Sequence, residues 1–210
     1  MQTTLLLIRH GETAWNVEGR IQGHLDQPLN DTGLAQARAV GKRFREEKLD
    51  CIFASDLCRA MQTAQPVAAA TGLRVAAEPA LRERHLGVLQ GLTGEEARTK
   101  TPQAWTAFRS RALDAHLEAG ESLAAFATRV LTALERIAQE NAGKRIAIVT
   151  HGGVLDAAYR RARRMPLEAP RDFPIFNASV NLLGFTNGCF EILRWGDISH
   201  LPEELSLDDT

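Results

Sequence analysis

Residues 3–11 read TTLLLIRHG, and this stretch decides the fold. The apolar run at 5–8 is continuous rather than alternating, which is typical of a strand buried on both faces of a parallel sheet. It ends abruptly in an arginine, a histidine and a glycine. Residues 145–153, RIAIVTHGG, repeat the order of apolar strand, histidine and glycine. Two strands that end alike predict an α/β protein whose polar groups gather at one edge of the sheet.

Composition and charge exclude several classes of protein. The chain has 210 residues, 44% of them hydrophobic, and a formal net charge of -1, which suits a single domain over residues 1–210. A near-neutral chain is not expected to bind nucleic acid or an anionic membrane. No charge-free run has membrane-spanning length, and no signal peptide is recognised, so we expect a cytoplasmic protein. Its three scattered cysteines are expected to be reduced core residues.

Strand-like and helix-like patterns alternate along the chain. Short apolar runs at 51–54 and 146–149 predict two further buried strands, each followed by a helical pattern. Near the end, residues 180–186 and 189–195 flank an Asn-Gly pair at 187–188 that suits a type I′ hairpin turn. We therefore expect a three-layer α/β/α sandwich, with a mainly parallel central sheet, an antiparallel C-terminal strand and a helical lid insertion.

Capping and breaking residues predict where the helices begin and end. Asp31 or Thr32 is expected to cap a helix, and Pro66 to kink or break the next one. Thr101–Pro102 is typical of a cap and first helical position. The hydrophobic period predicts a longer helix over about 122–141.

Four side chains are expected to converge at the carboxyl edge of the sheet. Arg9 and His10 follow the first strand, Arg59 lies on the first turn after the second, and His151 follows a later one. Taken singly, such a histidine is more often a hydrogen-bonded loop residue, and such an arginine a surface charge. Together, and with glycines and helix N-termini nearby, they favour a site for a dianionic oxyanion such as phosphate.

Four motifs in order, RHGETAWN, SDLCRAMQTA, LRERHLGVLQG and VTHGG, resemble those of the histidine phosphatase superfamily, also called the phosphoglycerate mutase-like family. The resemblance covers almost the whole chain. It implies that His10 is the nucleophile, forming a phosphohistidine that water then cleaves. It implies that Arg9, Arg59 and His151 bind and stabilise the phosphoryl oxygens. It also implies that Glu83 protonates the leaving oxygen and later accepts a proton from water. Without the resemblance, its charged neighbours would favour a surface position for Glu83.

Further positions are implied to bind phosphate or substrate, namely Asn16, Gln22, Gly23, Arg84 and Gly152. Specificity is expected in an insertion over about 84–120, which would fold over the edge as a lid. The candidates there are Arg84, His85, Trp105, Phe108 and Arg109. Packing of the helix is an equally good explanation for Trp105 and Phe108. Ser122 is either at the pocket rim or a helix N-cap.

The expected chemistry needs neither a metal ion nor another cofactor. The transition state of phosphoryl transfer spreads negative charge over three oxygens. The sequence has no Asp-rich metal cluster, whereas its arginines can neutralise this charge with bidentate bonds. A neutral imidazole is a competent nucleophile if its other nitrogen donates to a fixed acceptor. The sequence contains no cysteine-phosphatase loop, Gly-x-Ser-x-Gly elbow or Walker A loop.

Hydrolysis is favoured over intramolecular phosphotransfer. Cofactor-dependent phosphoglycerate mutases carry an Asn after the second His-Gly, a Tyr after the ERH motif and, further on, an arginine pair. This sequence has Gly153 and Leu86 at the first two positions and no adjacent arginine pair over 93–119. We expect a metal-independent phosphomonoesterase of small phosphorylated metabolites that releases inorganic phosphate.

A mutase-type phosphotransferase is the closest alternative to this hydrolase. A noncatalytic phosphate binder is a third hypothesis, against which the presence of both a nucleophile and an acid argues. The natural substrate is left open, and an oligomer is compatible with the sequence.

Overall fold

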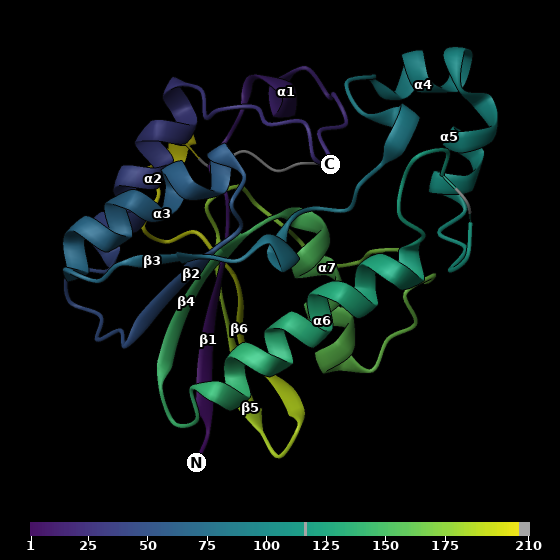
Figure 1. Ribbon diagram of the computed structural model, residues 1–210. Helices are drawn as coiled ribbons and strands as arrows, with labels where there is room; N and C mark the ends of the chain where they lie inside the picture. Colours follow the sequence, from purple (N-terminus) through teal and green to yellow (C-terminus); the bar gives the residue numbers. More distant parts are fainter. Residues whose placement is uncertain (116, 206–210) are drawn as a thin grey trace.

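A six-stranded sheet forms the centre of the molecule in a computed structural model that describes residues 1–115 and 117–205 (Figure 1). The domain expected over 1–210 and the insertion expected over 84–120 each include residues outside this description. The order of the strands across the sheet is β3-β2-β4-β1-β5-β6. The strands are β1 (Thr3–Arg9), β2 (Cys51–Ala54), β3 (Val75–Ala77), β4 (Arg145–Thr150), β5 (Val180–Thr186) and β6 (Cys189–Asp197).

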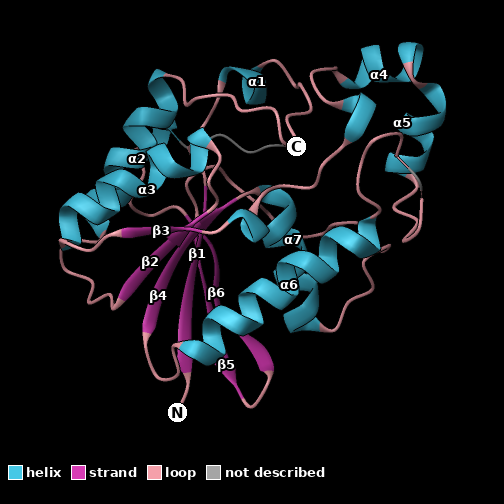
Figure 2. Ribbon diagram, in the orientation of Figure 1, coloured by secondary structure: helices cyan, strands magenta, loops and turns pink. Residues whose placement is uncertain are grey.

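Helices cover both faces of this sheet, as the α/β/α prediction requires (Figure 2). The α-helices are α1 (Ala14–Val17), α2 (Asp31–Arg43), α3 (Cys58–Thr71), α4 (Gly94–Lys100), α5 (Pro102–Arg109), α6 (Leu123–Glu140) and α7 (Gly152–Arg163). Three short 3₁₀ helices are η1 (Pro79–Leu81), η2 (Gly87–Leu89) and η3 (Glu203–Leu205). None of the helices within 1–115 and 117–205 is long and apolar enough to cross a membrane.

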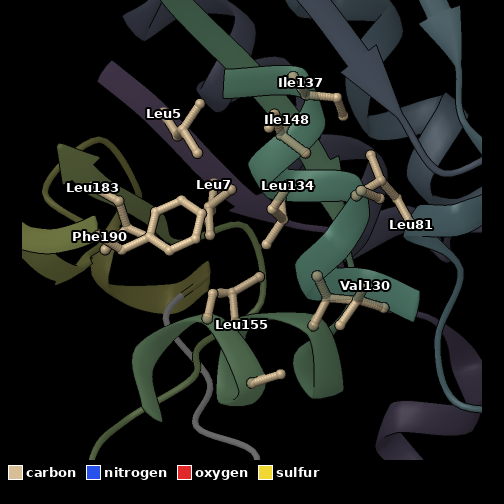
Figure 3. Close-up of a cluster of buried hydrophobic side chains, with 14 of the residues drawn as sticks. Leu5, Leu7, Leu81, Val130, Leu134, Ile137, Ile148, Leu155, Leu183 and Phe190 are labelled. Atoms are coloured by element: carbon tan, nitrogen blue, oxygen red, sulfur yellow. The ribbon is translucent and has the colours of Figure 1, made fainter. Parts of the chain in front are cut away.

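The continuous apolar run of β1 contributes side chains to two hydrophobic cores, one on each face of the sheet. Leu5 and Leu7 pack with α6 and α7 on one face (Figure 3), whereas Leu6 and Ile8 pack with α2 and α3 on the other. All four side chains are fully buried. Because side chains alternate between the faces of a strand, a strand with helices on both sides must be apolar at every position. This is the physical reason why the opening stretch predicts the fold.

The sheet is parallel from β3 through β2 and β4 to β1, and β5 then runs antiparallel to β1. β6 pairs antiparallel with β5 and so returns to the direction of β1. The reversed strand is therefore β5, and the expectation of an antiparallel C-terminal strand applies to β5 rather than to β6. Asn187 and Gly188 have φ angles of 51° and 78°, the positive values that the predicted type I′ turn requires.

Two helix predictions were wrong in detail. The cap of α2 is Asn30, whose side chain accepts from the Gly33 backbone N–H, and not Asp31 or Thr32. Of the kink or break expected at Pro66, the break does not occur, because α3 continues to Thr71. The ring of Pro66 lies so close to α2 that a Cβ on Gly41 would come within 2.6 Å of it. The proline removes one backbone hydrogen bond of the helix, and its ring packs closely against α2.

Two elements were not predicted from the sequence, and one cysteine lies at the surface rather than in the core. The edge strand β3 has only three residues, too few for a periodic pattern. Helix α4 begins with a capping box in which Thr93 and Glu96 hold each other's backbone N–H, a Thr-x-x-Glu signal visible in the sequence. Cys189 is exposed on the β5–β6 hairpin rather than in the core, whereas Cys51 and Cys58 are partly buried.

A third, smaller core lies under the helices of the expected insertion. Leu86, Leu89, Ala97 and Leu117 are buried there, with side chains of α4 and α5 packed against them. Figure 1 shows α4 and α5 away from the sheet, beyond the end of α6. This cluster holds the segment beside the carboxyl ends of the strands.

Candidate active site

Strand register brings the two histidines together. β1 and β4 are parallel neighbours with Arg9 opposite Thr150, so His10 and His151 leave the sheet side by side. Their ring centroids are 5.3 Å apart. The two similar stretches in the sequence therefore meet at one edge, as predicted.

The backbone and the ring of His10 are both fixed. Its N–H donates to the Thr150 carbonyl at 2.9 Å, and its carbonyl accepts from the Asn177 side chain at 3.0 Å. Nδ1 lies 2.7 Å from the Gly11 carbonyl oxygen. Because a carbonyl can only accept, Nδ1 carries the proton and Nε2 keeps its lone pair. Burial, and then the charges of Arg59 and Arg9, hold the pKa of His10 well below 6.5, so the ring is neutral near pH 7.

His151 is fully buried beside His10. Its Nε2 lies 2.8 Å from Ser55 Oγ, and among the described residues Nδ1 has no hydrogen-bond partner. Ser55 follows β2 and is placed beside β4 by the parallel pairing of these strands. Burial and the nearby Arg59 lower the pKa of His151 well below 6.5. The ring is therefore neutral, with one nitrogen held by Ser55.

Arg59 lies almost fully buried at the start of α3. Its Nη2 and Nη1 donate to the carbonyls of Gly23 and Leu25 at 2.8 and 3.1 Å, which fixes the loop before α2. Nε has no hydrogen-bond partner in the described chain, and burial lowers the pKa of the guanidinium to about 10. The group is still a cation at pH 7. Arg9 is buried as well and donates through Nη1 to the Ile175 carbonyl.

Glu83 is held from two directions. Its Oε2 accepts from the Gly153 N–H at 2.9 Å, and its Oε1 accepts from the Arg84 N–H at 2.8 Å. Gly153 lies in the first turn of α7, where backbone N–H groups are not used within the helix. A Cβ at position 153 would stand 2.1 Å from Oε1, so the carboxylate occupies space that only a glycine leaves open.

These groups surround a cavity of about 380 Å³ at the carboxyl ends of the strands. Of the residues predicted to form the site, those that line it are Arg9, His10, Asn16, Gln22, Gly23, Arg59, Glu83 and Gly152. His151 does not line the cavity, and its ring packs against that of His10. Gln22 Oε1 is buried with no partner among the described residues. Gly23 has a φ of 54°, and a side chain there would collide with Gln90.

The candidates from the insertion separate into two groups. Phe108 lines the cavity, whereas Trp105 packs in the small third core with its ring 5.9 Å from that of Phe108. Arg84 lines an adjoining cavity rather than the first one, and His85 packs edge-on against His24. Arg109 stacks over Trp105.

Ser122 is the N-cap of α6, accepting from the Ala125 N–H, which is the plainer of its two explanations.

Several lining residues were not foreseen, namely Trp15, Gly19, Arg20, Ile21, Arg171 and Ile175. Arg20 pairs with Glu18 and Glu96, which connects the loop after α1 to α4. Nothing in the sequence distinguishes Arg20 or Arg171 from other surface arginines, because their placement depends on how distant loops pack.

The site is basic at its centre, with helix α7 directing its N-terminus toward it. Within 1–115 and 117–205, no group of three or more His, Cys, Asp or Glu side chains is arranged to hold a metal ion. Two buried guanidinium groups, a neutral imidazole and a carboxyl thus meet in one cavity. This arrangement suits an anionic group that undergoes attack by the imidazole while the carboxyl supplies a proton.

Comparison with known proteins identifies the family. Residues 5–198 match the model of the histidine phosphatase superfamily (branch 1). The chain belongs to this family, which confirms the resemblance inferred from the four motifs.

Individual relatives are similar over almost the whole chain. It is 45% identical to phosphoglycerate mutase-like protein 4 of Arabidopsis thaliana, over 95% of this chain and 87% of that protein. It is 42% identical to the metal-independent phosphoserine phosphatase of Arabidopsis thaliana, over 95% of this chain and 83% of that protein. The solved structure of Bacillus stearothermophilus YhfR is 36% identical, with a TM-score of 0.88 over 94% of this chain and 98% of that one.

Proposed function

We propose that this protein is a phosphoric monoester hydrolase that cleaves small phosphorylated metabolites without a metal ion, through a phosphohistidine at His10. The observation that carries the proposal is the fixed tautomer of His10 in a cavity lined by Arg9 and Arg59. Similarity to the metal-independent phosphoserine phosphatase supports hydrolysis.

In the first half-reaction, Nε2 of His10 attacks phosphorus and the bond between phosphorus and the ester oxygen breaks. Arg9 and Arg59 neutralise the charge that spreads over the phosphoryl oxygens. His151 does not line the cavity and is proposed to act by positioning the His10 ring against which it packs; when Ser55 Oγ–H donates to its Nε2, the proton of the neutral ring lies on Nδ1. Glu83 gives its proton to the departing oxygen, which leaves as an alcohol.

In the second half-reaction, Glu83 accepts a proton from water as the water oxygen attacks the phosphohistidine. The bond between phosphorus and Nε2 breaks, inorganic phosphate is released and His10 returns to its neutral form. Asn16, Gln22 and the N–H of Gly152 are proposed to hold the phosphoryl group between these steps. All three line the cavity.

The mutase alternative is less favoured. A mutase must keep a bisphosphorylated intermediate and exclude water. Leu86 and Gly153, which both line the cavity, offer no side-chain hydrogen bond to such an intermediate. The insertion over 84–120, which contributes Leu86 and Phe108, is proposed to act as a lid. The cytoplasmic location remains a prediction.

The test is phosphate release from a panel of phosphomonoesters in the presence of a chelator. Wild type is compared with His10→Ala, and the same samples are tested for conversion of 3- to 2-phosphoglycerate with the bisphosphate added. We expect phosphate release by wild type alone, unaffected by the chelator. Isomerisation without net phosphate release, or loss of activity with the chelator, would contradict the proposal.

A further inference from the structure

The proton on Nδ1 of His10 depends on one peptide group, the peptide between Gly11 and Glu12. The Gly11 carbonyl oxygen lies 2.7 Å from Nδ1 and accepts its hydrogen bond. The N–H of the same peptide belongs to Glu12 and donates to Gln36 Oε1 at 2.8 Å. A peptide group is planar, with its C=O and N–H pointing in opposite directions, so a partner that holds the N–H also directs the carbonyl. Gln36 therefore directs the Gly11 carbonyl toward the His10 ring.

Gln36 reaches this peptide because helix α2 packs directly against it. A Cβ on Gly33, in the first turn of α2, would stand 2.0 Å from the Glu12 carbonyl oxygen and 2.8 Å from the Glu12 nitrogen. A Cβ on Gly11 would stand 2.6 Å from the Gly33 carbonyl oxygen. Gln36 follows Gly33 by three residues, on the same side of the helix, and its side chain is fully buried. The contact between the two glycines thus brings the Gln36 amide within reach of Glu12.

The other end of the Gln36 amide is held as well. Its Nε2 donates to the carbonyl of Leu205, in the 3₁₀ helix η3, at 2.8 Å. An N–H can only donate and a carbonyl can only accept, so the two partners fix which end of the amide faces Glu12. Three hydrogen bonds consequently run in one direction, from His10 Nδ1 through two amide groups to Leu205. Hydrogen bonds in such a series polarise and strengthen one another.

The preceding peptide, between His10 and Gly11, is held by other groups. Its N–H, on Gly11, donates to Thr63 Oγ1 at 3.0 Å. Its carbonyl, on His10, accepts from Asn177 Nδ2 at 3.0 Å. Thr63 is as fully buried as Gln36, so replacing either side chain leaves a backbone N–H without its partner. Of the two, Gln36 acts on the peptide whose carbonyl meets Nδ1.

We propose that Gln36 is a positioning residue that sets the reactive tautomer of His10 through the Gly11–Glu12 peptide. Gln36 is not among the residues that line the cavity, so it acts through this peptide and not on the substrate. The hydrogen bond made by one nitrogen of a neutral imidazole determines which nitrogen carries the proton. When the carbonyl faces Nδ1, Nε2 keeps the lone pair that attacks phosphorus; without this direction, part of the population carries the proton on Nε2 and cannot attack. The inference rests on the proposed attack by His10.

Three substitutions separate this role from ordinary stabilisation. Gln36→Met has nearly the same length and shape but cannot accept from the Glu12 N–H. Gln36→Glu restores an acceptor oxygen at the same place. Thr63→Val is the matched control, because it removes a buried hydrogen bond from the neighbouring peptide and keeps the shape of the side chain. Urea titration of each variant measures the stability that it has lost.

The tautomer is measured in long-range ¹⁵N–¹H NMR spectra of protein labelled at its six histidines, near pH 7. A ring nitrogen that carries a proton resonates well apart from one that keeps its lone pair, and the His10 signals are identified by their loss in His10→Gln. We expect the proton on Nδ1 in wild type, Gln36→Glu and Thr63→Val, and a mixture of both tautomers in Gln36→Met. An unchanged tautomer in Gln36→Met, or the same mixture in Thr63→Val, would overturn the proposal.

Kinetics provide a second readout. Phosphoenzyme formation in Gln36→Met, followed by rapid quench with 4-nitrophenyl phosphate, should slow by about 3- to 10-fold, the factor to which one ordinary hydrogen bond corresponds. The KM should stay unchanged because Gln36 does not line the cavity, and Gln36→Glu should recover most of the rate. A raised KM with an unchanged rate of phosphoenzyme formation would count against a positioning role.

If Gln36→Met does not fold, Gln36→Asn takes its place, because its amide is one methylene too short to reach the Glu12 N–H; the same two outcomes then decide. The NMR result does not depend on turnover. If wild type hydrolyses phosphomonoesters but the tautomer does not respond to Gln36, this inference fails and the phosphatase stands. If the tautomer responds but wild type hydrolyses no ester, the proposed function fails and the effect of Gln36 on His10 stands.

Discussion

Replacing Gly153 by alanine is expected to displace the proton donor while leaving the fold intact. The new Cβ would lie 2.1 Å from Glu83 Oε1 and 3.1 Å from both Glu83 Cδ and Phe126 Cζ. Cβ atoms do not approach other atoms to 2.1 Å, so the carboxylate must swing away. In doing so it gives up the 2.9 Å hydrogen bond from the backbone of residue 153.

The expected loss of stability is small, whereas the expected loss of activity is large. Alanine is favoured over glycine within a helix by about 1 kcal/mol, and the lost charged hydrogen bond costs about 1.5–3 kcal/mol. Stability should therefore fall by only about 0.5–2 kcal/mol, or roughly 1–8 °C in Tm for a chain of this size. Loss of a general acid lowers kcat by about 10²- to 10⁴-fold.

The assay compares esters whose leaving groups need protonation to different degrees. Gly153→Ala should lose most of its activity toward alkyl phosphates and retain most toward 4-nitrophenyl phosphate, whose phenolate leaves without a proton. Glu83→Gln is the reference and should show the same dependence on the leaving group. An equal loss toward both esters, or no loss at all, would refute the placement of Glu83 as proton donor.

Three further outcomes are expected. Ser55→Ala removes the hydrogen-bond partner of His151, so the free energy of unfolding should fall by about 1–3 kcal/mol in denaturant titration and kcat/KM should fall too. Burial and then Arg59 hold the pKa values of His10 and His151 below 6.5 in the folded protein, so the unfolded chain binds more protons below that pH. The free energy of unfolding should therefore decline as the pH falls below 6.5, until the folded-state pKa values are reached. Urea titrations across pH 4–8 would measure this decline. Ser122→Ala removes the cap of α6 and should lower Tm by about 2–4 °C with kcat unchanged, which thermal unfolding and a phosphatase assay would check.

The central sheet could be predicted because its signal is local. Residues 5–8 and 146–149 are apolar at every position, and such runs are typical of strands whose two faces are both covered. The hairpin turn could also be predicted from a local signal, because Asn187 and Gly188 adopt the positive φ angles that these residues favour. By contrast, α3 passes through Pro66 because of packing against α2, which no pattern within α3 reveals.

For the site, the sequence predicted which residues meet but not how they are held. Arg9, His10 and Arg59 were placed at one edge by the logic of parallel strands. The tautomer of His10 depends on the Gly11 carbonyl, and the orientation of His151 depends on Ser55. Such contacts are set by strand register.

Glu83 shows the limit of local reasoning most clearly. Its neighbours in sequence are charged, so the residues alone favoured a surface position, and only the family resemblance suggested a role. Its position depends on the Gly153 backbone, 70 residues away. Arg20 and Arg171 were missed for a similar reason, since both come to the cavity on loops that pack against distant elements.

The most direct test of the central claim is to identify the phosphorylated atom during turnover. Wild-type protein is mixed with substrate and chelator, quenched in alkali within milliseconds, and digested for mass spectrometry under conditions that preserve phosphohistidine. We expect a phosphoryl group on Nε2 of His10, because Nδ1 donates its hydrogen bond to the Gly11 carbonyl. Phosphate on another residue, or turnover with no phosphoenzyme at any time point, would contradict it.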